Sequence, residues 1–112
     1  MIETIYFGTY TRRLSQGIYQ ADFDTETGKL SNLKLFATEP SPTYLAFDQE
    51  NHLYTVGSKD GQGGIAAYQT DGTLLNHVVT EGAPHCYVAV DEKRGLVYGA
   101  NYNKGQVMVY KR

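Results

Sequence analysis

Two neighbouring residues, His85 and Cys86, are of the types that serve as base and nucleophile in covalent catalysis. Adjacent residues of a strand point to opposite faces, so the two side chains are not expected to form a dyad. Cys86 is instead expected to be a small, packed core residue. His85 stands at the entry to a predicted strand and is a candidate for lining a pocket, with an ordinary loop histidine as the alternative. The residues themselves identify no catalytic group, so the catalytic residues are left unassigned.

Asp48 and Asp91 could be read as a pair of carboxylates for acid–base work. Both occupy the same position of a repeated phrase, at a strand end, where an aspartate side chain caps a turn. Recurrence at a structural position favours turn capping. His52 and His77 fall in a tight turn and on an outer strand, and both are expected to face solvent.

Two loops present a tyrosine between hydrogen-bonding side chains: "NYN" at Asn101–Asn103 and "TYT" at Thr9–Thr11. Such groups suit sugar hydroxyls, although they also suit hydrogen bonding within the loop itself. The candidate substrate-binding residues are therefore His85, Asn101, Tyr102 and Tyr10.

The elements that position these residues are repeated along the chain. "PTYLAFDQENHLYTVG" (42–57) is followed by "PHCYVAVDEKRGLVYGAN" (84–101), and Tyr54 aligns with Tyr98. An earlier "IYFGTY" aligns Tyr6 with both. A period of about 40–50 residues built from short strands is typical of a β-propeller.

The repeat predicts an all-β fold, a β-propeller segment of about two and a half four-stranded antiparallel blades. The predicted units of this single partial domain are 1–40 (a first blade lacking its inner strand), 41–82 (a complete blade) and 83–112 (a third blade lacking its outer strand). Blade faces normally pack on neighbouring blades, so exposed faces are expected to drive self-association.

Alternate connections of a meander emerge at the same edge. The longer, more variable loops gather at one edge, which is where a binding site is expected. Its charged residues are four bases and three acids, a small imbalance for which solvated loop charges are the alternative explanation: Arg12, Arg13, Lys59, Lys104, Glu39, Asp60 and Glu81. The opposite edge holds the tight turns and is more acidic. The loop edge would better receive a phosphorylated or carboxylated sugar acid.

Composition excludes several classes of partner. The 112 residues carry a net charge of -2 with no basic run, so no nucleic-acid partner is expected. No apolar stretch approaches the roughly 18 residues of a membrane helix, and the opening residues lack a signal-peptide pattern. A single cysteine excludes an internal disulfide and predicts a cytoplasmic location. The absence of phosphate-loop, dinucleotide and zinc spacings predicts no cofactor and no metal.

In chain order, the phrases "GTYT" (8–11), "GIY" (17–19), "TGKL" (27–30), "PSPTYLAFD" (40–48) and "VYGANYNKGQVMVY" (97–110) resemble the lactonase family of seven-bladed β-propellers. Members of this family are roughly three times longer, so the resemblance implies the N-terminal third of such a fold. It also implies a sugar-lactone hydrolase, most nearly of 6-phosphogluconolactonase type in the pentose phosphate pathway.

The resemblance implies that the family's histidine, arginine and glutamate residues for the chemistry fall in later blades, beyond Arg112. The 112-residue chain alone is then expected to be inactive towards a sugar lactone. The alternative is a non-catalytic propeller that binds or scaffolds, because this architecture hosts many functions.

Overall fold

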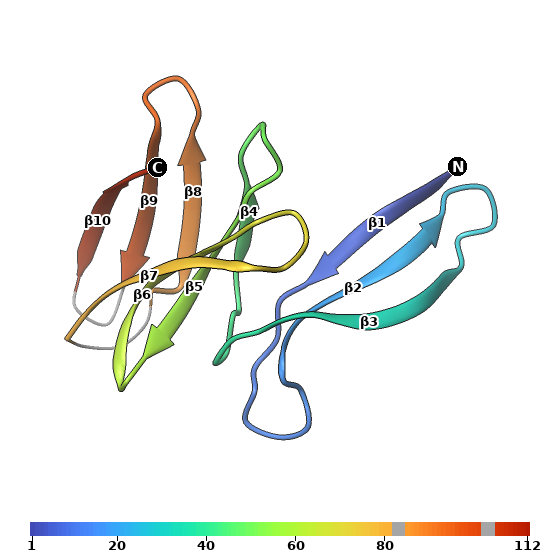
Figure 1. Ribbon diagram of the computed structural model, residues 1–112, viewed down its shortest axis with the longest axis horizontal. Helices are drawn as coiled ribbons and strands as arrows, with labels where there is room; N and C mark the ends of the chain where they lie inside the picture. The colour runs from blue at the N-terminus through green and yellow to red at the C-terminus, as the bar shows by residue number, and fades with distance from the viewer. Residues whose placement is uncertain (82–84, 102–104) are drawn as a thin grey trace.

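The computed structural model describes residues 1–81, 85–101 and 105–112, and every regular element in those ranges is a β-strand (Figure 1). The strands are β1 (Ile2–Phe7), β2 (Gly17–Asp24), β3 (Leu30–Thr38), β4 (Leu45–Phe47), β5 (Leu53–Lys59), β6 (Gln62–Tyr68), β7 (Leu74–Thr80), β8 (Tyr87–Asp91), β9 (Leu96–Asn101) and β10 (Gln106–Lys111). They form three antiparallel sheets: β1-β2-β3 (the first sheet), β4-β5-β6-β7 (the second) and β8-β9-β10 (the third). The predicted all-β propeller segment is confirmed.

Each sheet is an antiparallel meander, and tight turns follow β2, β4, β6 and β8. Gly28, Gly72 and Gly95 lie in the turns after β2, β6 and β8 with φ of 75°, 90° and 65°. A side chain at such a backbone angle would be strained, so glycine fits these positions.

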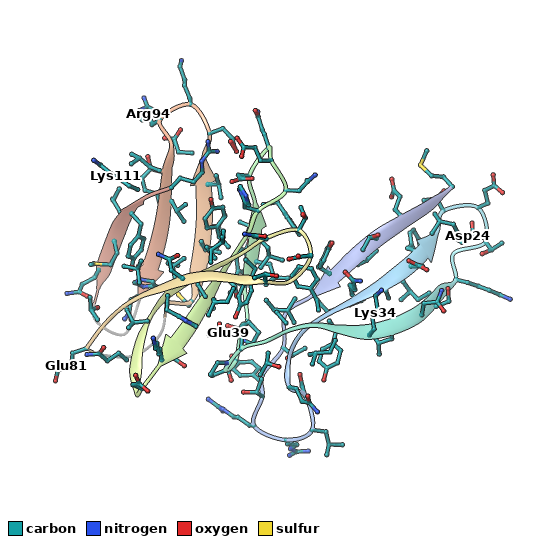
Figure 2. The ribbon with its side chains drawn as sticks, viewed as in Figure 1. Asp24, Lys34, Glu39, Glu81, Arg94 and Lys111 are labelled. Atoms are coloured by element: carbon teal, nitrogen blue, oxygen red, sulfur yellow. The ribbon has the colours of Figure 1, made fainter. Side chains whose placement is uncertain are left out.

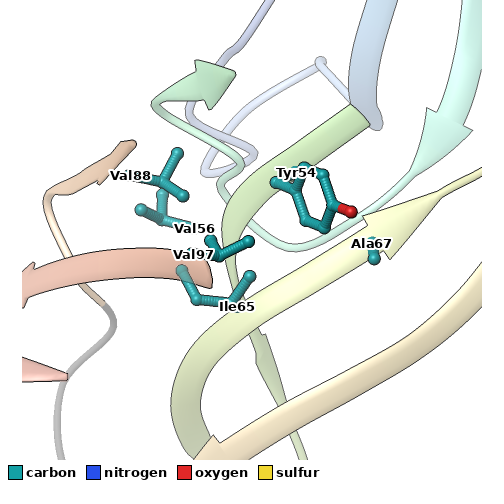
Figure 3. Close-up of a cluster of buried hydrophobic side chains, with 6 residues drawn as sticks. All are labelled: Tyr54, Val56, Ile65, Ala67, Val88 and Val97. Atoms are coloured by element: carbon teal, nitrogen blue, oxygen red, sulfur yellow. The ribbon is translucent and has the colours of Figure 1, made fainter. Parts of the chain in front are cut away.

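Apolar residues between the sheets form two cores, because side chains alternate along each strand. Ile18 and Ala37 of the first sheet pack against Leu53, Ala66 and Tyr68 of the second. On the opposite side of the second sheet, Tyr54, Val56, Ile65 and Ala67 pack against Val88 and Val97 of the third (Figure 3). The second sheet is thus buried on both faces, as an internal blade must be.

The recurring aspartate and tyrosine are explained by one hydrogen bond. Tyr54 donates its hydroxyl proton to Asp48 Oδ2 at 3.0 Å, and Tyr98 donates to Asp91 Oδ2 at 2.7 Å. Each aspartate also accepts turn N–H groups, from Glu50 and His52 in one repeat and from Arg94 in the other. The turn-capping interpretation of both aspartates is confirmed.

The strand directions separate two edges of the molecule (Figure 1). The tight turns after β2, β4, β6 and β8 lie at one edge, and the β1–β2 loop, the β3–β4 connection and the β5–β6 turn lie at the other. The latter is called the loop edge below. Within residues 1–81, 85–101 and 105–112, no helix is long and apolar enough to cross a membrane.

Candidate functional site

Three of the predicted binding residues, His85, Asn101 and Tyr10, lie at the loop edge but not in one cluster. His85 precedes β8 and Asn101 ends β9, and these neighbouring strands pair from Tyr87↔Ala100 onwards. Tyr10 lies in the β1–β2 loop of the first sheet, so the second sheet stands between it and that pair. Tyr102 lies outside the described residues.

His85 is buried, with 6% of its surface exposed. Its Nε2 lies 2.6 Å from the Tyr110 hydroxyl, and its ring packs on Gly99, where an added Cβ would come within 2.6 Å of the histidine Cδ2. Burial lowers the pKa of His85, so the imidazole is neutral at pH 7. Its Nδ1 is also buried and has no hydrogen-bond partner among the described residues.

Asn101 and Tyr10 differ sharply in exposure. Asn101 is 4% exposed at the end of β9, whereas Tyr10 is 64% exposed. The Arg12 guanidinium lies 5.1 Å from the Tyr10 ring centroid, within range of a cation–π contact. Tyr10 is therefore available at the surface, and Asn101 is part of the packed end of the third sheet.

The loop that carries Tyr10 is fastened to the β3–β4 connection by two reciprocal hydrogen bonds. The Thr11 N–H donates to Ser41 Oγ at 3.1 Å, and the Ser41 N–H donates to Thr11 Oγ1 at 3.0 Å. Ser41 holds a φ of 40°, an uncommon value for a residue with a side chain. These bonds fix the position of the tyrosine loop relative to the second sheet.

A buried polar cluster lies directly beside that connection, and sequence reasoning missed it. Glu39 is 1% exposed, and Figure 2 labels it where the chain passes from the first sheet to the second. Its carboxylate accepts the Tyr68 hydroxyl proton and the Ser58 N–H at 3.2 Å, and it lies 2.8 Å from His77 Nε2. Three strands of the second sheet therefore converge on one side chain of the preceding connection.

One prediction is wrong at this cluster. His77 is predicted to face solvent, but only 12% of its side chain is exposed. Glu39, counted among the charges of the loop edge, is enclosed. A buried carboxylate requires such partners, because an unpaired charge away from water is costly. A signal was present in the sequence: glutamate follows the last strand of two repeats, as Glu39 and Glu81.

Gly57 makes room for this carboxylate. A Cβ at position 57 would lie 2.6 Å from Glu39 Oε2, so any larger residue would displace the glutamate. Burial, followed by the hydrogen bond to Glu39, raises the pKa of Tyr68, which stays a hydroxyl donor at neutral pH. With its carboxylate enclosed, the cluster can position the loop edge but cannot itself reach a substrate.

The prediction that Cys86 is a packed core residue is wrong. The cysteine is exposed and free, and its Sγ lies 3.4 Å from the Ala100 carbonyl oxygen. It precedes β8, which begins at Tyr87, so the alternation of a strand does not apply to it. Within the described ranges, no group of three or more histidine, cysteine, aspartate or glutamate side chains could hold a metal ion.

The fold and the order of its repeated phrases define the class of protein to which this chain belongs. The chain belongs to the lactonase family of seven-bladed β-propellers, whose family model matches residues 4–112. It is 51% identical to the uncharacterized protein YwcC of Lactococcus lactis over 99% of this chain and 33% of that protein. It is 45% identical to the 6-phosphogluconolactonase of Bacillus subtilis over 94% of this chain and 32% of that protein.

Solved structures agree with this assignment. A protein from Lactobacillus plantarum superposes with a TM-score of 0.95 and 53% identity, over 99% of this chain and 33% of that one. The periplasmic gluconolactonase PpgL of Pseudomonas aeruginosa, 24% identical, shares the fold with a TM-score of 0.85, over 97% of this chain and 34% of that one. The chain thus spans about a third of the length of the relatives it matches.

Proposed function

We propose that this chain is the N-terminal third of a sugar-lactone hydrolase that acts on 6-phosphogluconolactone. The observation that carries the proposal is the 45% identity to a protein named 6-phosphogluconolactonase. The identity extends over 94% of this chain, so it covers the loop edge as well as the strands.

The reaction is the hydrolysis of a cyclic ester. Water attacks the lactone carbonyl carbon, the carbonyl oxygen becomes an oxyanion, and the ring C–O bond then breaks to give the open-chain acid. Hydrogen-bond donors aimed at the developing oxyanion supply most of the rate in such sites. In this proposal the present chain forms part of one pocket wall, and the remaining groups come from the later blades of the longer protein.

The residues proposed for that wall are those at the loop edge of the third and first sheets. His85 is neutral at pH 7, so it can accept or donate a hydrogen bond without carrying charge into the pocket. Tyr10 supplies an exposed neutral polar group suited to sugar hydroxyls, and Arg12 beside it suits the phosphate. Asn101 stays a proposed binding residue, with 4% of its surface exposed. Tyr102 remains a proposed binding residue.

The test compares two polypeptides in a 6-phosphogluconolactone hydrolysis assay followed by acid release. The 112-residue chain is expected to be inactive, and a chain of the relatives' length is expected to hydrolyse the lactone. In the longer chain, the His85→Ala and Asn101→Ala changes are expected to lower kcat/KM. Hydrolysis by the 112-residue chain would overturn the assignment of chemistry to later blades.

Absence of hydrolysis by the longer chain would overturn the proposed activity. Binding of the lactone without turnover would then favour the alternative, a propeller that binds without catalysis. Full activity of both alanine variants would remove His85 and Asn101 from the site while leaving the reaction class intact.

A further inference from the structure

Two tyrosines occupy the same position of the repeat, at the loop edge of neighbouring sheets. Tyr44 immediately precedes β4 and Tyr87 is the first residue of β8, and each stands four residues before the aspartate that caps the following turn. Their ring centroids lie 4.4 Å apart, with the ring planes inclined at 40°. The repeat therefore brings two aromatic rings into contact where the second and third sheets meet.

The strands that carry these tyrosines lie on the inner side of the propeller. β4 and β8 are each the first strand of a sheet, in the orders β4-β5-β6-β7 and β8-β9-β10. Among the described strands, the second and third sheets approach each other most closely where β8 lies against β4 and β5 (Figure 1). Propeller blades fan out around a central channel, so neighbouring blades are closest on the side of that channel. Tyr44 and Tyr87 are therefore placed beside the channel at its loop edge.

The exposure of Tyr44 follows from this inner position. The second sheet is covered on one face by the first sheet and on the other by the third. Its core residues Val56 and Ile65 are accordingly 0% and 5% exposed, yet Tyr44 is 39% exposed. Tyr87, the equivalent residue of the next repeat, is 47% exposed. Aromatic side chains that stay open beside a covered core are typical of the lining of a ligand site.

The chemistry of the pair suits an uncharged ring that carries hydroxyl groups. The C–H groups of a sugar ring can pack on the flat face of a tyrosine while sugar hydroxyls bond to polar groups at the ring's edge. The pKa of Tyr44 is raised, chiefly by the Tyr87 side chain beside it, so its hydroxyl stays a donor at neutral pH. Tyrosine also supplies a large contact area at a low cost in conformational entropy, because it has only two side-chain torsions.

We propose that Tyr44 and Tyr87 bind the sugar ring of the lactone by packing against its C–H face. This assignment rests on the proposed function and extends it to residues of the inner strands. Ser41, three residues before Tyr44, is hydrogen-bonded to Thr11, the neighbour of Arg12. The segment that binds the sugar ring is therefore fastened to the loop proposed to bind the phosphate.

The experiment uses a chain of the relatives' length and measures kcat and KM for 6-phosphogluconolactone. Tyr44→Ala and Tyr87→Ala each remove one ring, Tyr44→Phe keeps the ring without its hydroxyl, and Tyr44→Leu keeps apolar bulk without a flat ring. Leu75→Ala is the matched control, because Leu75 is 45% exposed on β7, at the opposite side of the same sheet from β4. Thermal unfolding followed by circular dichroism checks that each variant is folded.

A second readout is the binding of glucose 6-phosphate, measured by titration calorimetry. This compound has the same six-membered ring and phosphate but no ester to hydrolyse. Each alanine variant is expected to raise KM roughly two- to tenfold, the range typical of one aromatic contact, with kcat little changed. The dissociation constant of glucose 6-phosphate is expected to rise with KM.

The conservative variants separate ring recognition from packing. Tyr44→Phe is expected to keep KM within about twofold of the unmodified value, because the ring face is retained. Tyr44→Leu is expected to raise KM as the alanine change does, and Leu75→Ala to change neither constant. If the alanine variants fail to fold, the comparison of Tyr44→Phe with Tyr44→Leu decides.

The outcomes distinguish this assignment from the proposed function. An active chain whose KM is unchanged in both alanine variants, or is restored by Tyr44→Leu, would overturn the tyrosine site and leave the hydrolase intact. A chain without lactone hydrolysis that binds glucose 6-phosphate, and loses that binding in the alanine variants, would support the tyrosine site and overturn the hydrolase. A chain that neither hydrolyses the lactone nor binds glucose 6-phosphate would overturn both.

Discussion

Replacing Glu39 by alanine is expected to destabilise the chain far more than the loss of an exposed charged side chain would. The carboxylate is enclosed, and it accepts hydrogen bonds from Tyr68 and Ser58 and pairs with His77. Breaking a buried pair by removing one partner costs about 3–5 kcal/mol. Part of that cost comes from donors left unsatisfied, each worth roughly 1–3 kcal/mol when buried.

A domain of this size has a total stability of roughly 5–15 kcal/mol, so Glu39→Ala removes a large share of it. Glu39→Gln keeps the side-chain volume and one acceptor oxygen. Its amide NH₂ group, however, would face the hydrogen-bond donors that now contact the carboxylate. Its expected cost is about 1–3 kcal/mol, which keeps a folded variant available if the alanine variant does not fold. The matched control is Glu26→Ala, because 84% of the Glu26 side chain is exposed. A surface change of that kind costs within about 0.5 kcal/mol.

The assay is urea unfolding at pH 7, followed by tyrosine fluorescence, at one fixed protein concentration because association shifts apparent stability. A double-mutant cycle with His77→Ala isolates the pair, and a coupling energy above about 0.5 kcal/mol is expected for side chains in contact. The reasoning would be refuted if Glu39→Ala and Glu26→Ala had the same midpoint and slope.

Three further outcomes follow from the described contacts. Asp48→Asn is expected to cost about 1–3 kcal/mol at pH 7. Burial alone would raise the pKa of Asp48, but hydrogen bonds, led by those from His52, lower it. The contribution of the ionised Asp48 to folding stability is therefore present above the unfolded pKa of ~3.9. It is lost as the pH falls through the folded pKa. An acid titration followed by circular dichroism should show a flatter acid limb for this variant than for the unmodified chain. Gly64→Ala is expected to cost at least about 1–3 kcal/mol in urea unfolding, because its Cβ would lie 2.0 Å from the Val78 carbonyl oxygen; an unchanged midpoint would contradict the sheet packing. Cys86 should react with iodoacetamide in the folded chain nearly as fast as in urea, whereas protection would restore the core interpretation that the structure contradicts.

Much of the fold could be predicted because residues of the same type recur at equivalent positions of the sequence repeat. Tyr54 and Tyr98 each bond an aspartate that closes the preceding turn, so the same residues recur wherever the same local structure is needed. Glycines in the tight turns recur for the same reason, since the backbone there has positive φ. A repeat separates structural positions from variable ones without any knowledge of the contacts.

The polar cluster could not be predicted in this way because its partners lie far apart in sequence. Glu39 is separated from Tyr68 and His77 by 29 and 38 residues. A glutamate after a strand resembles a solvated loop charge unless the packing of the next sheet is known. The Cys86 prediction was wrong because it relied on the usual burial of cysteine, whereas Cys86 lies outside the strand, one residue before β8 begins.

The connection between β3 and β4 links the stability of the chain to the geometry of its loop edge. The β3–β4 connection holds Ser41, which is hydrogen-bonded to Thr11 beside Tyr10, and begins at Glu39, which is held by three strands of the second sheet. A change at Glu39 that spares folding should therefore shift the tyrosine loop, more than 25 residues earlier in the chain. In a lactone-hydrolysing protein of the relatives' length, Glu39→Gln should raise KM more than it lowers kcat, because the cluster positions a binding loop and touches no reacting atom. An equal loss in kcat with KM unchanged would instead place the cluster's effect at the chemical step.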